Sequence, residues 1–438
     1  MTPINVGLIS IVFVFIFLFL RMPVAYVMLV VGMAGFAYMT SPAAMFSLSS
    51  QTIFFTFSSY SLIVIPLFVW MGYIAYYSGL SSKIYDATYK VMGSMKAGLA
   101  LASIGACAAF GAICGSTTAT AATMSAVALP EMKRYNYDRS LATATIAAAA
   151  ILGVMIPPSI IFILYGIATG ESINRLFAAG IVPGLLLMGL FMLVTYLLAM
   201  RNPALAPAGP AVAWKDKIIA ILGGGVEVII IFAAVMGGLF FGIFTPTESG
   251  AMGAFATLLV ALVRRQLSWR GFVNSLNDAV RISAMIMFLV AAAAIYGRFL
   301  AVTGLPGGLA AWAVELPLPP VAILVVVLII YLILGCFIDA LALILLTVPI
   351  FYPVMMELGF DPIWFGVIVV LALGMGVLTP PVGANVYVVA GVDRETPVMT
   401  IFKGIWPFLL AIFVCIAILT IFPQIATFLP DLFFGPRR

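Results

Sequence analysis

Long apolar stretches dominate the chain and are separated by short segments that carry charged residues, Pro and Gly. A helix needs about 20 apolar residues to cross a bilayer, so these stretches predict an all-α polytopic membrane protein. The pattern predicts ten crossings, at residues 4 to 20, 23 to 40, 53 to 77, 141 to 169, 176 to 200, 218 to 244, 246 to 263, 282 to 303, 364 to 391 and 404 to 430.

Two further apolar stretches have the wrong length for a crossing. Residues 97–130 are free of charge, but one helix of this length would span about 51 Å against a hydrocarbon core of about 30 Å. Two crossings would need about 40 residues. We therefore expect a re-entrant helical hairpin over 97–132, with the Gly/Ser/Thr-rich run 111–120 at its tip, and a second over 318–356 with its tip at 335–339. Irregular backbone at membrane depth requires burial in protein or a water-filled cavity, which makes the tips candidate sites.

Composition narrows the classes of function. Of 438 residues, 65% are hydrophobic and 8% are charged, whereas soluble domains carry about 25% charged residues. This composition leaves no room for a soluble catalytic domain, and we expect neither an enzyme nor a nucleic-acid partner. The chain has no His, which removes the usual general base and zinc ligand. Its four Cys show no CxxC spacing, so a disulfide framework or a metal site is not expected.

The basic residues indicate the orientation in the membrane. With the N-terminus outside and both hairpins re-entrant, one side receives Arg21, Lys83, Lys90, Lys96, Lys133, Arg134, Arg139, Arg201, Lys215, Lys217, Arg264, Arg265, Arg270, Arg281, Arg394 and Lys403. The other side receives Arg175, Arg298, Arg437 and Arg438. By the positive-inside rule the larger group is cytoplasmic, and both termini are periplasmic. Residues 4–20 lack a basic n-region and an A-x-A site, so we expect a crossing there and not a cleaved signal.

The two halves of the chain repeat each other at an offset of 223 residues. Residues 153–158 align with 376–381, and residues 137–138 align with 360–361. Pro130 over Pro353 and Pro23 over Pro246 have the same offset. Each half contains five crossings, an odd number, so the second half starts on the opposite side of the membrane. Inverted repeats with discontinuous helices are typical of secondary transporters, whose binding sites lie near the midplane.

The repeat defines the expected domain organisation. The predicted parts are 1–96 (scaffold and arm of repeat 1), 97–200 (transport part of repeat 1), 201–217 (a cytoplasmic linker with Pro203, Pro207 and Pro210), 218–314 (scaffold and arm of repeat 2) and 315–438 (transport part of repeat 2). Residues 79–96 and 264–281 mix basic and apolar residues, a pattern that favours interfacial arms.

Pro pairs interrupt one crossing in each half, at Pro157-Pro158 and Pro380-Pro381. Pro cannot donate a backbone hydrogen bond, and it pushes the preceding residue out of the helical region. Each crossing should therefore split into two half-helices. The first half-helices end in carbonyls, around 153–156 and 374–379, that can ligate a hard cation. The second begin with N–H groups near Ser159, or near Gly383 and Asn385, that suit an anion. The alternative interpretation is a pair of packing kinks.

The hairpin tips add oxygen atoms, the ligands that suit sodium better than a transition metal. Gly115, Ser116, Thr117 and Thr118 supply hydroxyls and carbonyls in the first tip, although Ser/Thr runs in membrane helices often serve packing alone. Asp339 stands in the second tip with apolar residues on both sides. A carboxylate at membrane depth is costly and indicates ion binding or coupling. The alternative is a structural role, such as capping a helix N-terminus.

Seven segments resemble the large membrane subunit of tripartite ATP-independent periplasmic (TRAP) transporters, the DctM type. They are GAICGSTTATAATM (111–124), GVMIPPS (153–159), LFAAGIVPG (176–184), GIFTPTE (242–248), LGCFIDALALILLTVPIFYPV (334–354), LGFDPIWFGV (358–367) and GVLTPPVGANVYV (376–388). The resemblance implies an elevator-type, sodium-coupled importer of the ion transporter superfamily in a bacterial inner membrane, with sodium as coupling ion and no other cofactor. It implies three partners: a separate four-helix small subunit of the DctQ type, a periplasmic binding protein of the DctP type, and an organic acid such as a C4-dicarboxylate or sialic acid.

The resemblance also implies roles for individual residues. One sodium would be held by Gly115, Ser116, Thr117 and Gly153, and a second by Asp339, Gly374, Gly376 and Thr379. The substrate carboxylate would lie between the tips, near Ser116, Thr118, Pro158, Ser159, Pro380 and Asn385.

Three other functions make different demands on the sequence. A divalent-anion symporter of the same superfamily, which works without a binding protein, is the main alternative. An intramembrane protease would need a Ser/His pair or a GxGD aspartate pair, and the chain has neither. A channel would not need paired inverted hairpins.

Overall fold

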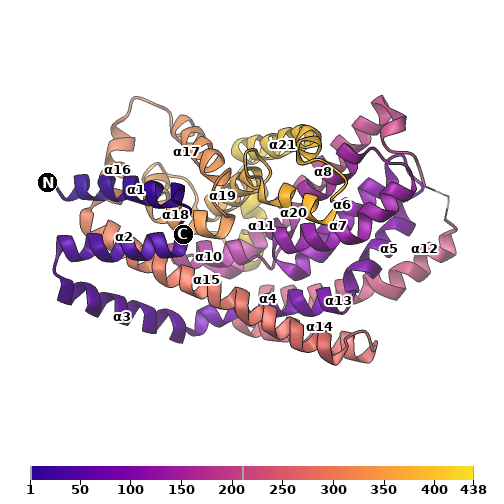
Figure 1. The fold of residues 1–438 in the computed structure, drawn as a ribbon, viewed down its shortest axis with the longest axis horizontal. Coiled ribbons are helices and arrows are strands. Elements are labelled where there is room, and N and C mark those ends of the chain that lie inside the picture. The colour runs from indigo at the N-terminus through magenta and orange to yellow at the C-terminus, as the bar shows by residue number, and fades with distance from the viewer. Residues whose placement is uncertain (1, 210–211, 438) are drawn as a thin grey trace.

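The computed structural model describes residues 2–209 and 212–437, and every regular element in these ranges is a helix. Pro210 of the predicted linker and Arg438 of the charge pattern lie outside the described residues. Most of the helices run along the long axis of the molecule (Figure 1). The prediction of an all-helical polytopic membrane protein is confirmed.

The first half contains four helices, an arm, a hairpin, a broken helix and a long final helix. Its elements are α1 (Pro3–Phe19), α2 (Val24–Met39), α3 (Pro42–Ser58), η1 (Tyr60–Ile63), α4 (Val64–Tyr77), α5 (Leu80–Met92), α6 (Gly98–Cys114), α7 (Thr117–Arg134), α8 (Arg139–Ala149), α9 (Leu152–Met155), α10 (Ile160–Thr169) and α11 (Ile173–Arg201).

The second half repeats this order after a short linker helix. Its elements are η2 (Pro203–Leu205), α12 (Trp214–Ala220), η3 (Ile221–Gly225), α13 (Val226–Phe240), α14 (Pro246–Val263), α15 (Trp269–Thr303), α16 (Leu305–Glu315), α17 (Pro320–Gly335), α18 (Ala340–Glu357), α19 (Pro362–Gly376), α20 (Ala384–Val392), α21 (Val398–Ile421) and α22 (Gln424–Phe434). Both hairpins, α6–α7 and α17–α18, form where the sequence predicts them.

Six described helices are long and apolar enough to cross a membrane on their own, and a seventh span is bent by 44° between Met155 and Ile160. One of the six is α18, which belongs to the second hairpin. Three of the predicted crossings, α1, α2 and α13, are apolar helices of 15 to 17 residues. The count of ten crossings therefore stays a prediction.

The predicted crossing at 53–77 is present, but its predicted start is wrong, because the apolar span runs from Tyr60 to Tyr77. One helix, α3, begins at Pro42 behind the cap Ser41 and ends at Ser58, and a second run starts at Tyr60. Ser59 between them is extended. The break places Pro66 in the first turn of α4, where its missing N–H costs little; in an unbroken helix it would remove an internal hydrogen bond.

Two other predicted boundaries are also wrong. Residues 269–281 do not form a separate arm, because they continue into the next crossing as the 35-residue helix α15, about 52 Å long. At the C-terminus the predicted crossing 404–430 ends at Ile421. Pro423 cannot continue the hydrogen-bond ladder and forces Phe422 out of the helical region, so α22 starts as a new helix.

The two repeats pack on each other in reciprocal pairs. Helix α15 lies along α2, and its counterpart α4 lies along α14. The hairpin helix α7 contacts α20, and its counterpart α18 contacts α10. Each hairpin thus packs against the broken helix of both repeats, which is the arrangement expected of two halves related by an approximate two-fold axis.

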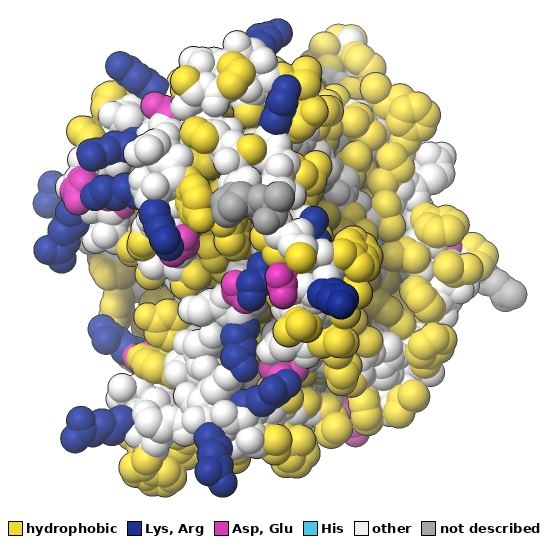
Figure 2. Space-filling view, turned by 90° about the vertical axis from the view of Figure 1, so that its right-hand side faces the viewer, with side chains coloured by type: hydrophobic (Ala, Val, Ile, Leu, Met, Phe, Trp, Pro, Cys, Tyr) yellow, Lys and Arg dark blue, Asp and Glu magenta, His cyan; other side chains and the backbone are white. Residues whose placement is uncertain are grey.

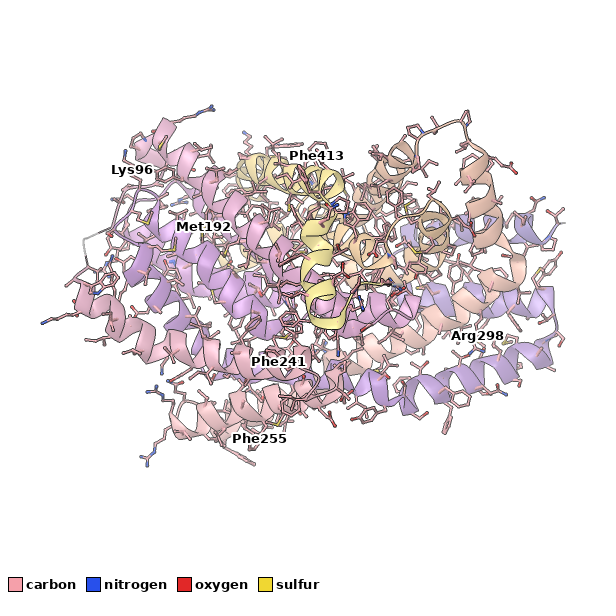
Figure 3. The ribbon with its side chains drawn as sticks, turned by 180° about the vertical axis from the view of Figure 1, so that it is seen from behind. Lys96, Met192, Phe241, Phe255, Arg298 and Phe413 are labelled. Atoms are coloured by element: carbon pink, nitrogen blue, oxygen red, sulfur yellow. The ribbon has the colours of Figure 1, made fainter. Side chains whose placement is uncertain are left out.

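Lys and Arg side chains are numerous on the end of the molecule that faces the viewer in Figure 2. The predicted cytoplasmic segments meet there, since Asp138 N–H donates to the Leu205 carbonyl at 2.9 Å and Gly209 N–H donates to the Gly93 carbonyl at 2.9 Å. Lys96 and Arg298 lie toward opposite ends, while Phe241, Phe255 and Phe413 lie on the outer surface (Figure 3). The separation agrees with the predicted charge pattern; the sidedness of the termini stays a prediction.

Close glycine contacts join each hairpin to the broken helix of its own repeat. A Cβ on Gly111 would lie 2.4 Å from the Gly153 Cα, and a Cβ on Gly376 would lie 2.6 Å from the Gly335 Cα. Real Cβ atoms do not come this close to backbone, so both contacts require glycine. The two pairs are equivalent in the repeat and hold each tip against a helix break.

We expect Gly111→Ala to lower the melting temperature of the purified chain by several degrees, because overpacking at a rigid backbone contact costs about 1 to 3 kcal/mol. The control is Gly189→Ala in α11, where an added Cβ would meet nothing within 4 Å. That variant should match or slightly exceed the wild type, since Ala is the better helix former. Thermal unfolding in detergent measures both variants. Equal melting temperatures for Gly111→Ala and wild type would contradict the contact.

Candidate functional site

The first hairpin turns at Gly115 and Ser116. Gly115 has a φ of 64°, in the left-handed region that favours glycine, and ends α6. Ser116 is extended and caps α7, its Oγ accepting from Ala119 N–H at 3.4 Å. The Thr120 hydroxyl donates to the Ser116 carbonyl at 2.7 Å. The tip is therefore a short irregular turn formed by Gly115 and Ser116.

This tip contacts the break in the first broken helix. A Cβ on Gly153 would lie 3.2 Å from the Ser116 carbonyl oxygen, and a Cβ on Gly115 would lie 2.8 Å from the Pro158 carbonyl oxygen. Thr117 is buried beside them. The structure thus brings together all four residues expected at the first ion site, and Pro158 with them. Their carbonyl and hydroxyl oxygens are the kind of ligand that a hard cation prefers.

The second hairpin repeats this arrangement with different chemistry. Asp339 caps α18, its Oδ2 accepting from Leu341 N–H at 3.0 Å. Asp339 and Ser116 stand at the offset of the repeat, so the same capping position carries a carboxylate in one tip and a hydroxyl in the other. The predicted structural role of Asp339 as a helix cap is present. A role in ion coupling stays a prediction.

The other residues expected at the second ion site are Gly374 and Gly376, in the last turn of α19, and Thr379, just after it. Gly376 faces the hairpin through Gly335, but a Cβ on Gly374 would lie 2.7 Å from Ile151 Cγ2, in the other broken helix. The Thr379 hydroxyl donates to the Met375 carbonyl at 2.7 Å. Gly374 thus lies at the contact between the two broken helices, while Gly376 and Thr379 lie at the end of α19.

The two helix breaks differ in exposure. Pro157, Pro158 and Ser159 are buried, and Ser159 caps α10 by accepting from Phe162 N–H at 3.4 Å. In the second repeat Pro380 and Pro381 are exposed, and Gly383, with a φ of 54°, starts α20. Both Pro–Pro bonds are cis. The predicted half-helices are confirmed in both repeats.

Asn385, expected near the substrate carboxylate, makes hydrogen bonds within the protein. Its side chain is fully buried, and its Nδ2 donates to the Ala147 carbonyl at 3.2 Å. Its backbone N–H donates to the Val377 carbonyl at 3.1 Å. The Ala147 carbonyl can accept because α8 tightens at this point, where Ile151 N–H bonds to Ala148 instead. Asn385 therefore joins the two broken helices, and no side-chain pattern could have indicated Ala147 as its partner.

The substrate residues predicted from sequence divide into two groups. Ser116 and Thr118 have their hydroxyls 3.3 Å apart, Thr118 is exposed, and Pro380 is exposed as well. Ser159 and Asn385 are fully buried and engaged in hydrogen bonds within the protein. Pro158 is buried with the second group, so the first group is the more accessible one in this conformation.

Paired re-entrant hairpins, helices broken at equivalent depth and oxygen-rich tips define a polytopic membrane transport protein. The fold matches a solved membrane transporter, YdaH of Alcanivorax borkumensis, with a TM-score of 0.60 over 90% of both chains at 16% identity. A family model described as "Tripartite ATP-independent periplasmic transporter, DctM component" matches residues 11–425, and the chain belongs to this family.

Curated relatives cover nearly the whole chain. The C4-dicarboxylate TRAP transporter large permease protein DctM of Pseudomonas aeruginosa is 35% identical over 89% of this chain and 91% of that protein. The sialic acid TRAP transporter large permease protein SiaM of Vibrio cholerae is 32% identical over 94% of this chain and 96% of that protein. The 2,3-diketo-L-gulonate TRAP transporter large permease protein YiaN of Escherichia coli is 32% identical over 95% of both. The predicted family is confirmed: the chain is a TRAP large permease.

Asn385→Leu should lower the melting temperature markedly, because it leaves the buried Ala147 carbonyl without a donor at a cost of about 1 to 3 kcal/mol. The matched control, Asn277→Leu, makes the same change on the exposed face of α15 and should leave stability unchanged. If Asn385→Leu kept wild-type stability and only weakened substrate uptake, the structural role assigned to Asn385 would be wrong.

Proposed function

We propose that this permease imports an organic acid by sodium-coupled, elevator-type transport, together with a DctQ-type small subunit and a DctP-type periplasmic binding protein in a bacterial inner membrane. Sodium is the coupling ion, and it binds at the two tips. The substrate carboxylate binds between them. The transport part, residues 97–200 and 315–430, moves relative to a scaffold made from residues 1–96 and 218–314.

The observation that carries the proposal is the pairing of each tip with a helix break. The Ser116 carbonyl oxygen lies against Gly153, and the Pro158 carbonyl oxygen lies against Gly115. The second tip meets its helix break through Gly335 and Gly376, and it carries a carboxylate at Asp339. Oxygen atoms from irregular backbone suit sodium, and a bound cation would offset the cost of the Asp339 charge at membrane depth. Sodium would also draw a substrate carboxylate toward Ser116 and Thr118.

The contact between the proposed scaffold and the proposed transport part supports movement. In the scaffold helix α4, a Cβ on Gly72 would lie 3.0 Å from the Cα of Cys114, at the first tip. In the second repeat, a Cβ on Gly297 of α15 would lie 4.0 Å from the Cγ of Pro349 in α18. These contacts consist of apolar groups and bare backbone. Movement along them would break few hydrogen bonds.

The substrate class follows from the relatives together with this site. The relatives are named for C4-dicarboxylate, sialic acid and 2,3-diketo-L-gulonate, all of which carry a carboxylate. The accessible atoms of the tips are hydroxyls and backbone groups, which recognise a carboxylate without selecting the rest of the molecule. The binding protein is then the main source of selectivity.

We expect proteoliposomes that contain both membrane subunits to take up one member of a carboxylate panel, such as succinate, N-acetylneuraminate or 2,3-diketo-L-gulonate. Uptake should require both an inward sodium gradient and the binding protein. Uptake without the binding protein would favour the self-sufficient symporter instead. Uptake that needs neither sodium nor the binding protein would refute the proposal.

Asp339→Asn should abolish sodium-driven uptake while keeping the melting temperature near that of the wild type, because Asn still caps α18 but carries no charge. Asp361→Asn is a matched control, since Asp361 caps α19 by accepting from Trp364 N–H at 2.8 Å. It should retain both stability and uptake. Wild-type uptake by Asp339→Asn would leave its carboxylate with a capping role alone.

A further inference from the structure

A cavity of about 820 Å³ lies at the basic end of the molecule, beside the first hairpin. Its walls come from α7, the turn into α8, the first turns of α8 and the loop that follows α20. Both repeats therefore contribute to it. The volume lies within the range of about 300 to 1,000 Å³ that is typical of small-molecule sites.

Three charged side chains in the wall of this cavity form a cluster. Lys133 Nζ donates to both carboxylate oxygens of Glu395 at 2.8 Å, and Arg139 Nη2 lies 3.4 Å from Glu395 Oε2. Arg139 Nη1 also donates to the Glu395 backbone carbonyl at 3.4 Å. The hydrogen bond and the charge of Lys133 hold the pKa of Glu395 below its usual range, so the carboxylate is ionised at neutral pH. Glu395 thus pairs with both cations and offsets part of their charge, and Asp393, which also lines the cavity and accepts from the Thr396 hydroxyl, adds a second negative charge.

Polar atoms without partners continue the wall toward the tip. Ser125 stands eight residues before Lys133 on α7, about 12 Å closer to the tip. It is fully buried, and its Oγ has no hydrogen-bond partner among the described residues. Pro130 has no N–H, so the Ala126 carbonyl receives no helical hydrogen bond from it. Buried polar atoms are normally paired, so the fold leaves hydrogen-bonding capacity unused beside this wall.

We propose that this cavity is the vestibule through which the transported acid leaves the protein, and that Glu395 occupies Lys133 and Arg139 so that they do not retain the departing carboxylate. The inference rests on the proposed function. Two uncompensated cations would hold a carboxylate through charge-assisted hydrogen bonds. Glu395 is fixed in the adjoining loop, so it competes with any passing acid at a high effective concentration.

The electrostatic part can be tested with a cysteine probe in the purified full chain. Ala126 is exposed and lines the cavity, whereas the four native cysteines are buried, so Ala126→Cys supplies a site with a low background. It is labelled with an anionic methanethiosulfonate (sulfonatoethyl) and with a cationic one (trimethylammonium-ethyl). Adding Glu395→Gln should raise the anionic-to-cationic rate ratio at least about fivefold, because Lys133 and Arg139 then lose the carboxylate that pairs with both of them, while Asp393 stays in both variants. Succinate should slow the anionic reagent in Glu395→Gln and much less in its parent.

The matched control is Glu131→Gln, which removes the same charge near the same end of α7, where Glu131 pairs with Arg134. It should leave the ratio nearly unchanged. No labelling of Ala126→Cys, or equal ratios in the two Gln variants, would overturn the vestibule. For the acid identified by the uptake panel, Glu395→Gln should slow turnover severalfold, and unchanged turnover would overturn the role in release. Labelling needs no transport, so its result is independent of whether the proposed transport is correct.

Discussion

The close approach of two glycine pairs is the constraint on which the rest of the structure depends. Gly111 against Gly153 and Gly335 against Gly376 let the backbone of each hairpin reach the backbone of a broken helix without intervening side chains. A side chain at any of the four positions would push the tip away from the break. The polar backbone of both segments would then lie at membrane depth without protein around it, which is not stable.

This contact explains why irregular backbone is tolerated there. Each turn brings its own cap: Ser116 and Asp339 accept from the first turn of α7 and α18, and Ser159 accepts from the first turn of α10. The fourth half-helix, α20, starts at Gly383 without a side-chain cap, and Asn385 joins it to α8 instead. The repeat therefore keeps its geometry while its chemistry differs, and the only carboxylate among these caps is in the second tip.

The sequence was sufficient to predict what periodicity, length and Pro control. The two hairpins and the breaks at Pro157 and Pro380 are local features, and the structure contains each of them. Predictions failed where the signal was weak or depended on tertiary contacts. The end of α3 at Ser58 has no Gly or Pro to mark it. The basic residues at the start of α15 suggested a separate arm, but the helix continues through them into the crossing.

The site shows the same division. Gly115, Ser116, Thr117 and Gly153 come together because the motifs that contain them form adjacent turns. The buried position of Asn385 could not be predicted, because it depends on a carbonyl that is released by a local tightening of α8 more than 200 residues away. An amide at a helix start has the same sequence signature whether it faces a ligand or a neighbouring helix. Only the packing of α20 against α8 distinguishes the two.

The distribution of contacts argues that the two hairpins and both broken helices behave as one rigid body. At the basic end, the loop after α20 is tied to α7 through Glu395 and Lys133. At the other end, the loop after α10 is tied to α18, since the Tyr352 hydroxyl donates to Glu171 at 2.7 Å, and Arg437 pairs with the same carboxylate. Each tie joins one repeat to the hairpin of the other, and the tips are joined to the breaks between them. The contacts between scaffold and transport part at Gly72 and Gly297 consist of backbone and apolar groups. The proposed movement would therefore take place at this boundary, which no ion pair at these two positions holds together.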